Sequence, residues 1–356
     1  MGHEGTLEVI ADAPAALIVP AGSTWLPPVT LSPAEFDGHL PRVVLDPQGG
    51  TFVVWLSRDP DVEGRERVHA VFRPTGGSFG LMQPIFDASN GQPTPPVPYL
   101  QVARDGQGNK LVVWTRSFTT STSDRVQAAF IPAGEISAVA DIISEDGQDA
   151  HDPQVAFGRS GDALVVWHRF DGTHQRIQAT YRPAGGSFEP PQTISDPGQD
   201  AFEPQLTFDR GGNTLAVWTR SDGTNRRVQV AFRPASGRFE PAQTLSEAGQ
   251  NASAPQVAVA PQGNAIVIWD RSDGTNRHVQ VASRPSGGVF GRPQNISADG
   301  GSAFRPQIGF DSRGGAAAIW QHSSGANTSV QAASRPPGGG SFESPQTISP
   351  AALSTD

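Results

Sequence analysis

Histidines and acidic residues gather in one short part of the sequence. Asp149, His151 and Asp152 stand close together, and His168 and His174 follow soon after them. Two histidines and a carboxylate can hold zinc, or can act as a general acid and a general base. The spacing has no H-x-x-x-H pattern, so exposed histidines without a function are the alternative interpretation.

Arginines recur shortly after tryptophans that end apolar runs of the sequence. An arginine binds a carboxylate through two parallel hydrogen bonds, so a set of them would suit acidic sugars. Because nearly every tryptophan has one, a structural role in holding the next loop or stacking on tryptophan is the alternative. The residues are Arg58, Arg116, Arg169, Arg220 and Arg271, with His322 at the sixth place.

A third set of candidates occupies equivalent places but differs in chemistry from one place to the next. Each member comes just before an expected first strand, and the six are Leu40, Tyr99, Asp152, Glu203, Ala254 and Arg305. Six different residues could form an asymmetric ligand site, to which Tyr99, Asp152, Glu203 and Arg305 would contribute. The alternative interpretation is that these side chains are exposed to solvent and vary without a function.

Cofactor chemistry has little support in the sequence. The segments "EDGQDAHD" (145–152) and "DPGQDAFE" (196–203) could bind calcium through carboxylates and carbonyls, but neither fits a full calcium-loop pattern. The absence of cysteine excludes disulfides, thiolate metal sites and cysteine nucleophiles. No phosphate loop, dinucleotide fingerprint or G-x-S-x-G is present, so no cofactor is expected.

The elements that would position these residues come from an internal repeat. Six apolar runs end in tryptophan, at Trp55, Trp114, Trp167, Trp218, Trp269 and Trp320, about 51 to 59 residues apart. The third copy predicts four short strands, over 153–158, 163–169, 176–183 and 188–195. The second strand is apolar on successive residues, which indicates cover on both faces, and the prolines of the fourth indicate a free edge.

Six repeats of this kind predict an all-β fold, a six-bladed β-propeller of four-stranded antiparallel blades. Solenoid coils are usually shorter, and a β-sandwich needs about seven strands per unit. Residues 19–32 align with the outer strand at 233–246, so we expect an N-terminal half-blade that closes the ring. The predicted organisation is an N-terminal segment at 1–32, the propeller at 33–349 and a tail at 350–356.

The repeated ending "RPAGGSF…PQTIS" and the "DGT" turns resemble repeat propellers of secreted or surface proteins from high-GC bacteria. The chain is also distantly similar to lectin-like and sialidase-like propellers, although it lacks the sialidase Asp-box. This resemblance implies an architecture and transfers no catalytic residue.

Composition narrows the class of partner. The net charge is −9 and no run of basic residues occurs, which is unlike a nucleic-acid binder. No apolar segment approaches the roughly 18 residues of a membrane span. We expect a monomer located outside the cell or at its surface, and a cytoplasmic location is the alternative.

Variation among the copies concentrates in loops at 57–67, 87–100 and 116–125, which would lie on one face. Such a face on a rigid frame suits a glycan or protein ligand, and relaxed drift of surface loops is the alternative. The sequence therefore predicts a non-enzymatic binding or display module. A glycan-active hydrolase or lyase and a purely structural spacer are the alternatives.

Overall fold

The computed structural model describes residues 28–46, 48–58, 66–86, 99–116, 123–325 and 327–349. These residues form two compact units, one of 28–170 with 179–192 and the other of 171–178 with 193–349. The variable loops predicted at 57–67, 87–100 and 116–125 lie largely outside the described residues, as do most of the N-terminal segment and the tail. No helix that could cross a bilayer occurs in the described part of the chain.

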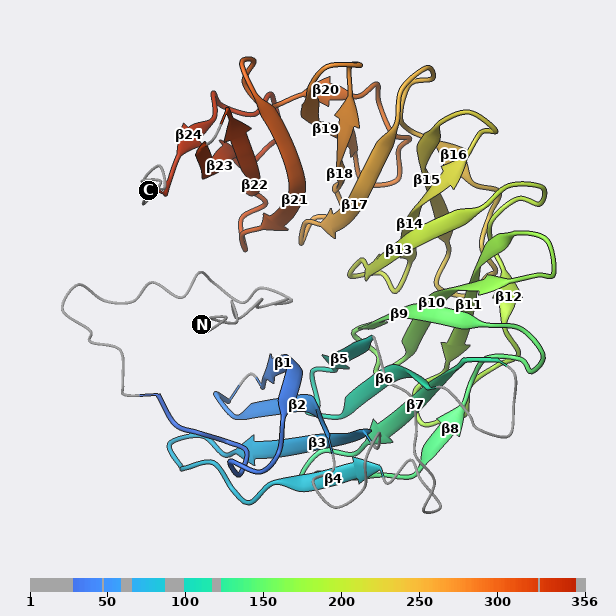
Figure 1. The fold of residues 1–356 in the computed structure, drawn as a ribbon, viewed down its shortest axis with the longest axis vertical. Helices are drawn as coiled ribbons and strands as arrows, with labels where there is room; N and C mark the ends of the chain where they lie inside the picture. The colour runs from blue at the N-terminus through green and yellow to red at the C-terminus, as the bar shows by residue number, and fades with distance from the viewer. Residues whose placement is uncertain are drawn as a thin grey trace. The chain divides into compact units, whose positions relative to one another are not determined.

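Six four-stranded antiparallel sheets make up the fold, and within each sheet consecutive strands are neighbours (Figure 1). This confirms the predicted all-β, six-bladed propeller. The first two sheets are β1 (Gly38–Leu45), β2 (Thr51–Arg58), β3 (Glu66–Arg73), β4 (Gln83–Phe86) and β5 (Leu100–Arg104), β6 (Lys110–Arg116), β7 (Arg125–Ile131), β8 (Ala140–Ile142). The next two are β9 (Ala150–Phe157), β10 (Ala163–Phe170), β11 (Gln175–Arg182), β12 (Gln192–Thr193) and β13 (Ala201–Phe208), β14 (Thr214–Ser221), β15 (Arg226–Arg233), β16 (Gln243–Thr244). The last two are β17 (Ala252–Val259), β18 (Ala265–Ser272), β19 (Arg277–Arg284), β20 (Gln294–Asn295) and β21 (Ser302–Phe310), β22 (Ala316–Ser324), β23 (Asn327–Arg335), β24 (Gln346–Thr347). We number the sheets blades one to six in this order.

In blades two and five the second strand is buried on both faces because it packs against a neighbouring blade on each side, whereas Ala317 and Ile319 of β22 in blade six are exposed. In β6, Val112 and Trp114 join a core shared with blade one, while Leu111 and Val113 join a core shared with blade three. All six tryptophans that end these runs are buried. In the last three blades the indole N–H also donates to a glutamine on the third strand, at 3.1–3.2 Å.

The outer strands are shorter than the sequence predicts. In blade three the predicted strand at 188–195 contains only the two residues of β12. Pro190 and Pro191 cannot donate to a ladder, so the segment joins β11 through single bonds from the N–H of Glu189 and of Ile194. The predicted closing strand at 19–32 lies mostly outside the described residues, and 28–32 contain no strand.

Cations held over phenylalanine rings join neighbouring blades. The guanidinium carbon of Arg182 in blade three lies 3.7 Å from the ring centre of Phe130 in blade two, and that of Arg284 in blade five lies 4.5 Å from Phe232 in blade four. In blade two the corresponding place is Ile131, and Lys110 on the paired strand supplies the cation instead. Its ammonium lies 5.3 Å from the ring centre of Phe52 and donates to the carbonyls of Pro132 and Glu135.

Candidate functional site

The first strand of each blade carries a fixed backbone irregularity at the place where the sequence varies most. In five blades the residue there adopts a left-handed conformation, with φ between 50° and 56°, at Leu40, Asp152, Glu203, Ala254 and Arg305. The register with the second strand shifts at the same point, as in a β-bulge, which redirects side chains out of the ladder. Because leucine, alanine and charged residues all occur there, the fold fixes the conformation and leaves the side chain free to vary.

Tyr99 and Asp152, two of the predicted site residues, lie near each other in the first unit. Burial raises the pKa of the Tyr99 phenol, and the negative charge of Asp152 raises it further. The Asp152 carboxylate also accepts a hydrogen bond from the Gln154 side chain at 3.2 Å. Tyr99 therefore remains protonated at neutral pH and can donate a proton.

In the second unit, backbone N–H groups at the variable positions donate to carboxylates of the preceding blade. The Glu203 carboxylate accepts the backbone N–H of Ala254 at 3.1 Å, and the backbone N–H of Arg305 donates to Asp270 at 3.3 Å. The Arg305 side chain is exposed. Glu203 and Arg305 thus lie at equivalent places on different blades of one unit.

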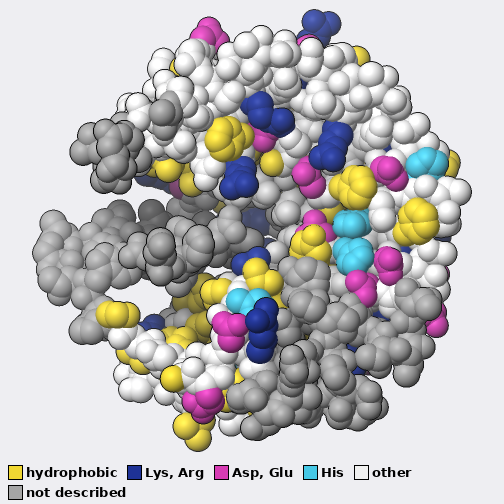
Figure 2. All heavy atoms as spheres, in the orientation of Figure 1, with side chains coloured by type: hydrophobic (Ala, Val, Ile, Leu, Met, Phe, Trp, Pro, Cys, Tyr) yellow, Lys and Arg dark blue, Asp and Glu magenta, His cyan; other side chains and the backbone are white. Residues whose placement is uncertain are grey.

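His151 and His168 form a pair in blade three. They are direct cross-strand partners between β9 and β10, and their ring centres are 5.7 Å apart. Asp124, directly before β7, places a carboxylate oxygen 3.7 Å from His151 Nε2. Figure 2 shows histidine side chains beside acidic ones on one face of the molecule. An imidazole near a carboxylate can accept a proton, because the carboxylate stabilises the resulting cation.

Asp149 links this pair to the preceding blade. One of its carboxylate oxygens accepts the backbone N–H of Asp124 at 2.8 Å. Asp200, Asn251 and Ser302 accept the corresponding N–H groups in the next three blades, at 2.8–3.2 Å. An amide or a hydroxyl makes the same contact, so the charge of Asp149 is not needed for it. Asp124, Asp149 and His151 place one ligand atom each within 4.8 Å of one another, a set that could hold a divalent cation.

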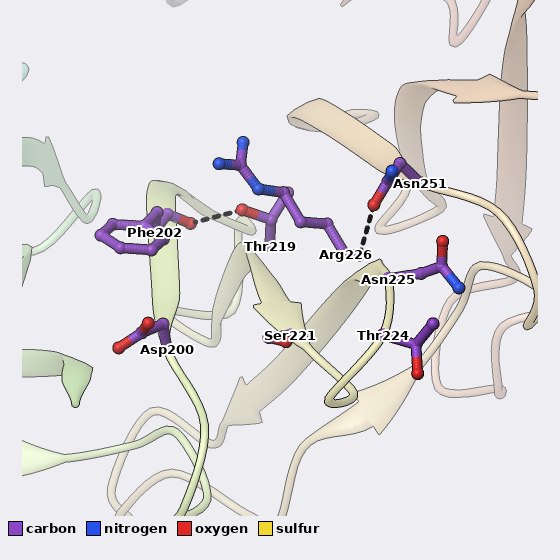
Figure 3. Close-up of a pocket in the computed structure, with 8 residues that line it drawn as sticks. All are labelled: Asp200, Phe202, Thr219, Ser221, Thr224, Asn225, Arg226 and Asn251. Carbon is purple, nitrogen blue, oxygen red and sulfur yellow. Dashed lines mark hydrogen bonds between the residues drawn. The ribbon is translucent and has the colours of Figure 1, made fainter. Parts of the chain in front are cut away.

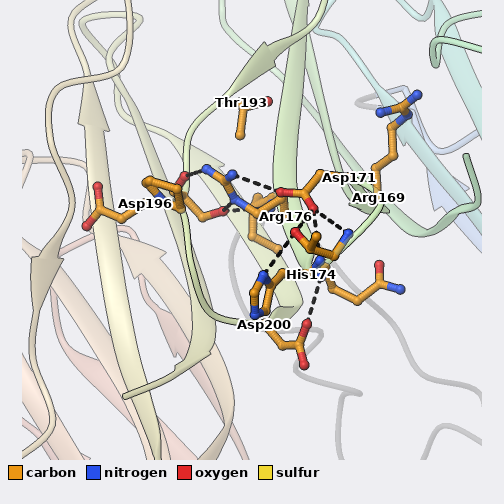
Figure 4. Close-up of polar contacts among 12 residues, drawn as sticks. Arg169, Asp171, His174, Arg176, Thr193, Asp196 and Asp200 are labelled. Carbon is orange, nitrogen blue, oxygen red and sulfur yellow. Dashed lines mark hydrogen bonds and ion pairs between the residues drawn. The ribbon is translucent and has the colours of Figure 1, made fainter. Parts of the chain in front are cut away.

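His174, the last histidine of the predicted cluster, belongs to the other unit and has a structural environment there. Its backbone N–H donates to Asp171 at 2.8 Å, as do the hydroxyl and N–H of Thr173, and Arg176 forms an ion pair with the same carboxylate (Figure 4). These hydrogen bonds hold the pKa of Asp171 far below its usual range.

The arginines after the tryptophans are engaged within the protein wherever their contacts are described. Arg169, Arg220 and Arg271 donate to backbone carbonyls of the loop that enters their own blade, at 2.9–3.4 Å. Arg58 forms an ion pair with Asp37 at 3.5 Å. Arg116 ends β6 as the cross-strand partner of Arg125.

A polar pocket of about 280 Å3 opens in blade four, in the second unit (Figure 3). Hydroxyls, amides, one carboxylate, one guanidinium and one aromatic ring line it, from Asp200, Phe202, Thr219, Ser221, Thr224, Asn225, Arg226 and Asn251. Among the sequence-predicted site residues, none lines this pocket.

Sequence reasoning missed Asp124 and Arg226. Asp124 comes from the neighbouring blade, and only the spatial order of the blades brings it to His151. Arg226 follows a "DGTN" turn that recurs in blade five, so nothing in the sequence marked it as different. The direct pairing of His151 with His168 was not accessible from the sequence, because an undisturbed register would place Asp152 opposite His168 and the bulge shifts the register by one residue.

No protein-family model matches the sequence, and no curated protein matches it significantly. Among solved structures, a PL25 ulvan lyase bound to -[GlcA(1-4)Rha3S]- aligns with a TM-score of 0.54 at 10% identity, over 85% of this chain and 82% of the lyase. An α-L-arabinofuranosidase of family GH93 from Fusarium graminearum, in complex with arabinobiose, aligns at 0.49 and 12% identity, over 86% and 95%. An α-L-arabinanase from Penicillium chrysogenum aligns at 0.48 and 14% identity, over 81% and 89%.

At these identities the likeness establishes the fold alone. It nevertheless corrects the expectation that the chain is not an enzyme. That expectation relied on the view that near-identical blades leave no distinct pocket, whereas a lyase is among the solved structures that share this fold. Blade three also departs from its neighbours in this chain, because its histidine pair occupies places held by Phe202 and Thr219 in blade four.

Proposed function

We propose that the protein is a glycan-active enzyme that cleaves acidic polysaccharides by β-elimination. The observation that carries the proposal is the His151–His168 pair with Asp124 beside it, which is a set of proton acceptors that the scaffold does not require. The likeness to a lyase that binds a glucuronate-containing chain supports the same class of substrate.

The residues suit the two proton transfers that elimination requires. A histidine of the pair takes the proton from the ring carbon next to the sugar carboxylate. The electron pair of that C–H bond forms the new double bond, and the bond from the adjacent carbon to the glycosidic oxygen breaks. The Tyr99 hydroxyl then gives its proton to the departing oxygen, and solvent restores both groups.

Asp124 and Tyr99 are assigned by electrostatics. Asp124 would stabilise the cation formed on His151, from which its carboxylate lies 3.7 Å away. Tyr99 would act as the acid, because a tyrosine hydroxyl is protonated at neutral pH and can donate its proton. Tyr99 directly precedes β5, and β5 packs beside the strand β9 that carries His151.

Hydrolysis is a second candidate, favoured by one observation. Carboxylate oxygens of Asp124 and Asp149 lie within 4.8 Å of each other, and retaining glycosidases use two carboxyl groups about 5–5.5 Å apart. One oxygen of Asp149 already accepts a backbone N–H, which leaves the other for chemistry.

The reaction products separate the two candidates. The purified protein is incubated with ulvan, alginate, polygalacturonate and hyaluronan, and both ultraviolet absorbance and new reducing ends are measured. Elimination yields an unsaturated uronate that absorbs ultraviolet light, whereas hydrolysis yields reducing ends without that absorbance. Absence of unsaturated product from every polymer would contradict the elimination.

Variants test the assignment of the histidines. We expect His151→Ala and His168→Ala to lower the elimination rate about a hundredfold or more, because general base catalysis contributes at this level. His174→Ala is the matched control and should leave the rate unchanged, with circular dichroism verifying that each variant is folded. Full activity in both His151→Ala and His168→Ala would refute the site.

A further inference from the structure

Blade five contains a buried ion pair that blade four lacks. Asp270 is 3% exposed and pairs with Arg277, whose guanidinium also donates to Ser253. Ser253 donates to the same carboxylate oxygen at 3.0 Å. The side chain of Arg277 thus turns inward onto a carboxylate that the protein itself supplies.

At the same places in blade four, 51 residues earlier, the carboxylate is missing and the arginine remains. Thr219 replaces Asp270, Phe202 replaces Ser253, and Arg226 replaces Arg277. The two arginines have the same backbone anchor, because Arg226 N–H donates to Asn251 as Arg277 N–H donates to Ser302. The anionic acceptor and the serine hydroxyl beside it are missing from blade four.

The consequence is an open pocket with a guanidinium at its rim. The Arg226 side chain is exposed and has no hydrogen-bond or ion-pair partner among the described residues. In Figure 3 it extends across the pocket toward Thr219, which is buried and donates to the Phe202 carbonyl at 3.2 Å. A guanidinium that is oriented but not neutralised is suited to an anion from outside.

The rest of the lining suits a sugar. Ser221, Thr224 and Asn225 offer hydroxyl and amide groups, and Phe202 offers an aromatic side chain. Asp200 uses one carboxylate oxygen for the N–H of Gln175, which leaves the other to accept hydrogen bonds from sugar hydroxyls. The volume of about 280 Å3 is just below the usual range of ligand pockets, so the pocket suits a ligand as small as a single sugar residue.

We infer that the pocket of blade four binds the carboxylate of a uronate residue, with Arg226 holding it as Arg277 holds Asp270. Asp270 acts in blade five as an internal substitute for this ligand. The site belongs to the second unit, whereas the residues assigned to catalysis belong to the first, and binding at the site requires no reaction. Uronate binding here and elimination at His151 and His168 can therefore fail independently.

The affinity of small sugars tests the inference. Methyl glucuronide, its uncharged methyl ester, methyl glucoside and glucose 6-sulfate are titrated into the full chain and followed by NMR. We expect saturable binding of methyl glucuronide, and at least tenfold weaker binding of the ester and the glucoside. Equal binding of the ester would overturn the role of the charge, and equal binding of the sulfate would overturn the assignment to a carboxylate.

Two variants locate the site. Arg226→Ala removes the guanidinium, and Thr219→Asp installs the carboxylate that fills the same place in blade five. Each should weaken glucuronide binding at least tenfold, while Arg210→Ala, an equal change of charge in a turn outside the pocket, should not. Wild-type affinity in Arg226→Ala would overturn the inference even if Thr219→Asp did not fold, as would absence of saturable binding to the wild type.

Discussion

Because the blades repeat, each residue of this protein can be compared with the equivalent residues of the other blades. Five residues within the first strands share a left-handed backbone, and a proline follows each of them. The sequence revealed that these places vary, but it did not reveal the conformation, since proline disfavours only the right-handed helical region for the residue before it. Side chains other than glycine are strained there, by about 1–3 kcal/mol each.

Ala254 tests that strain directly. Ala254→Gly should raise the free energy of unfolding by up to about 1 kcal/mol, because glycine adopts a φ of 51° without a steric penalty, partly offset by its greater entropy when unfolded. Thermal or urea unfolding measures the change. Ala258→Gly, a substitution in the regular part of the same strand, is the control and should destabilise the protein.

For the candidate site, the sequence predicted which types of residue take part better than it predicted which residues contact one another. The chemistry of His168 and Asp152 was accessible because blade three contains them and other blades do not. The role of Asp124 could not be predicted from the sequence, since its distance from His151 depends on how β7 and β9 pack. Arg226 was hidden for a different reason, because its significance comes from the acceptor that Thr219 fails to provide.

Turns between the second and third strands are elements with their own electrostatics. Asp222 and Asp273 each accept backbone N–H groups from the two following turn residues that close the turn. These hydrogen bonds lower the pKa of both carboxyl groups, most strongly that of Asp273, as they do for Asp171. The motif "DGT" predicts a turn, but it does not indicate that the carboxyl group of its aspartate has a lowered pKa.

The turns predict how stability depends on pH. A carboxyl group with a lowered pKa stabilises the fold above its unfolded value of about 3.9, and this contribution is lost as the pH falls further. We therefore expect stability to fall below about pH 4, and Asp222→Asn with Asp273→Asn to flatten that fall while the amide oxygens retain the turns. Urea unfolding at a series of pH values measures it. An unchanged pH profile in the double variant would contradict this origin.

The cation between blades one and two comes from a different strand than in the other blades. Blade one pairs Thr51 with Arg73, whose guanidinium donates to the threonine hydroxyl at 3.0 Å, whereas blade two pairs Lys110 with Ile131. The cation has changed strands while its place over the phenylalanines is kept. The sequence shows a lysine at Lys110 and an isoleucine at Ile131. Only the strand register shows that these two residues are cross-strand partners and form one exchange.

The exchange can be reversed experimentally. Lys110→Thr should lower stability by about 1–2 kcal/mol, because it removes a partly desolvated cation from two phenylalanine rings. Adding Ile131→Arg restores the arrangement of blade one and should recover most of the loss. Denaturant unfolding of the single and double variants gives the coupling energy, and additive losses would show that the two places are independent.

For the whole molecule, the repeat of tryptophans was sufficient to predict six sheets and their strand order. An apolar run of successive residues requires cover on both faces, and neighbouring blades provide it on each side in blades two and five. The first strands begin earlier than predicted, as β9 does at Ala150, since the alternation of side chains is interrupted at the bulge. Function did not follow from the repeat, because it depends on where single copies depart from the common pattern.

Lys110 is the only lysine in the chain, and it is 5% exposed with its ammonium hydrogen-bonded to two carbonyls. Reagents that acylate lysine therefore find no accessible side chain while blade two is intact. Acylation at this single position would report local opening of that blade, site-specifically and without any introduced label.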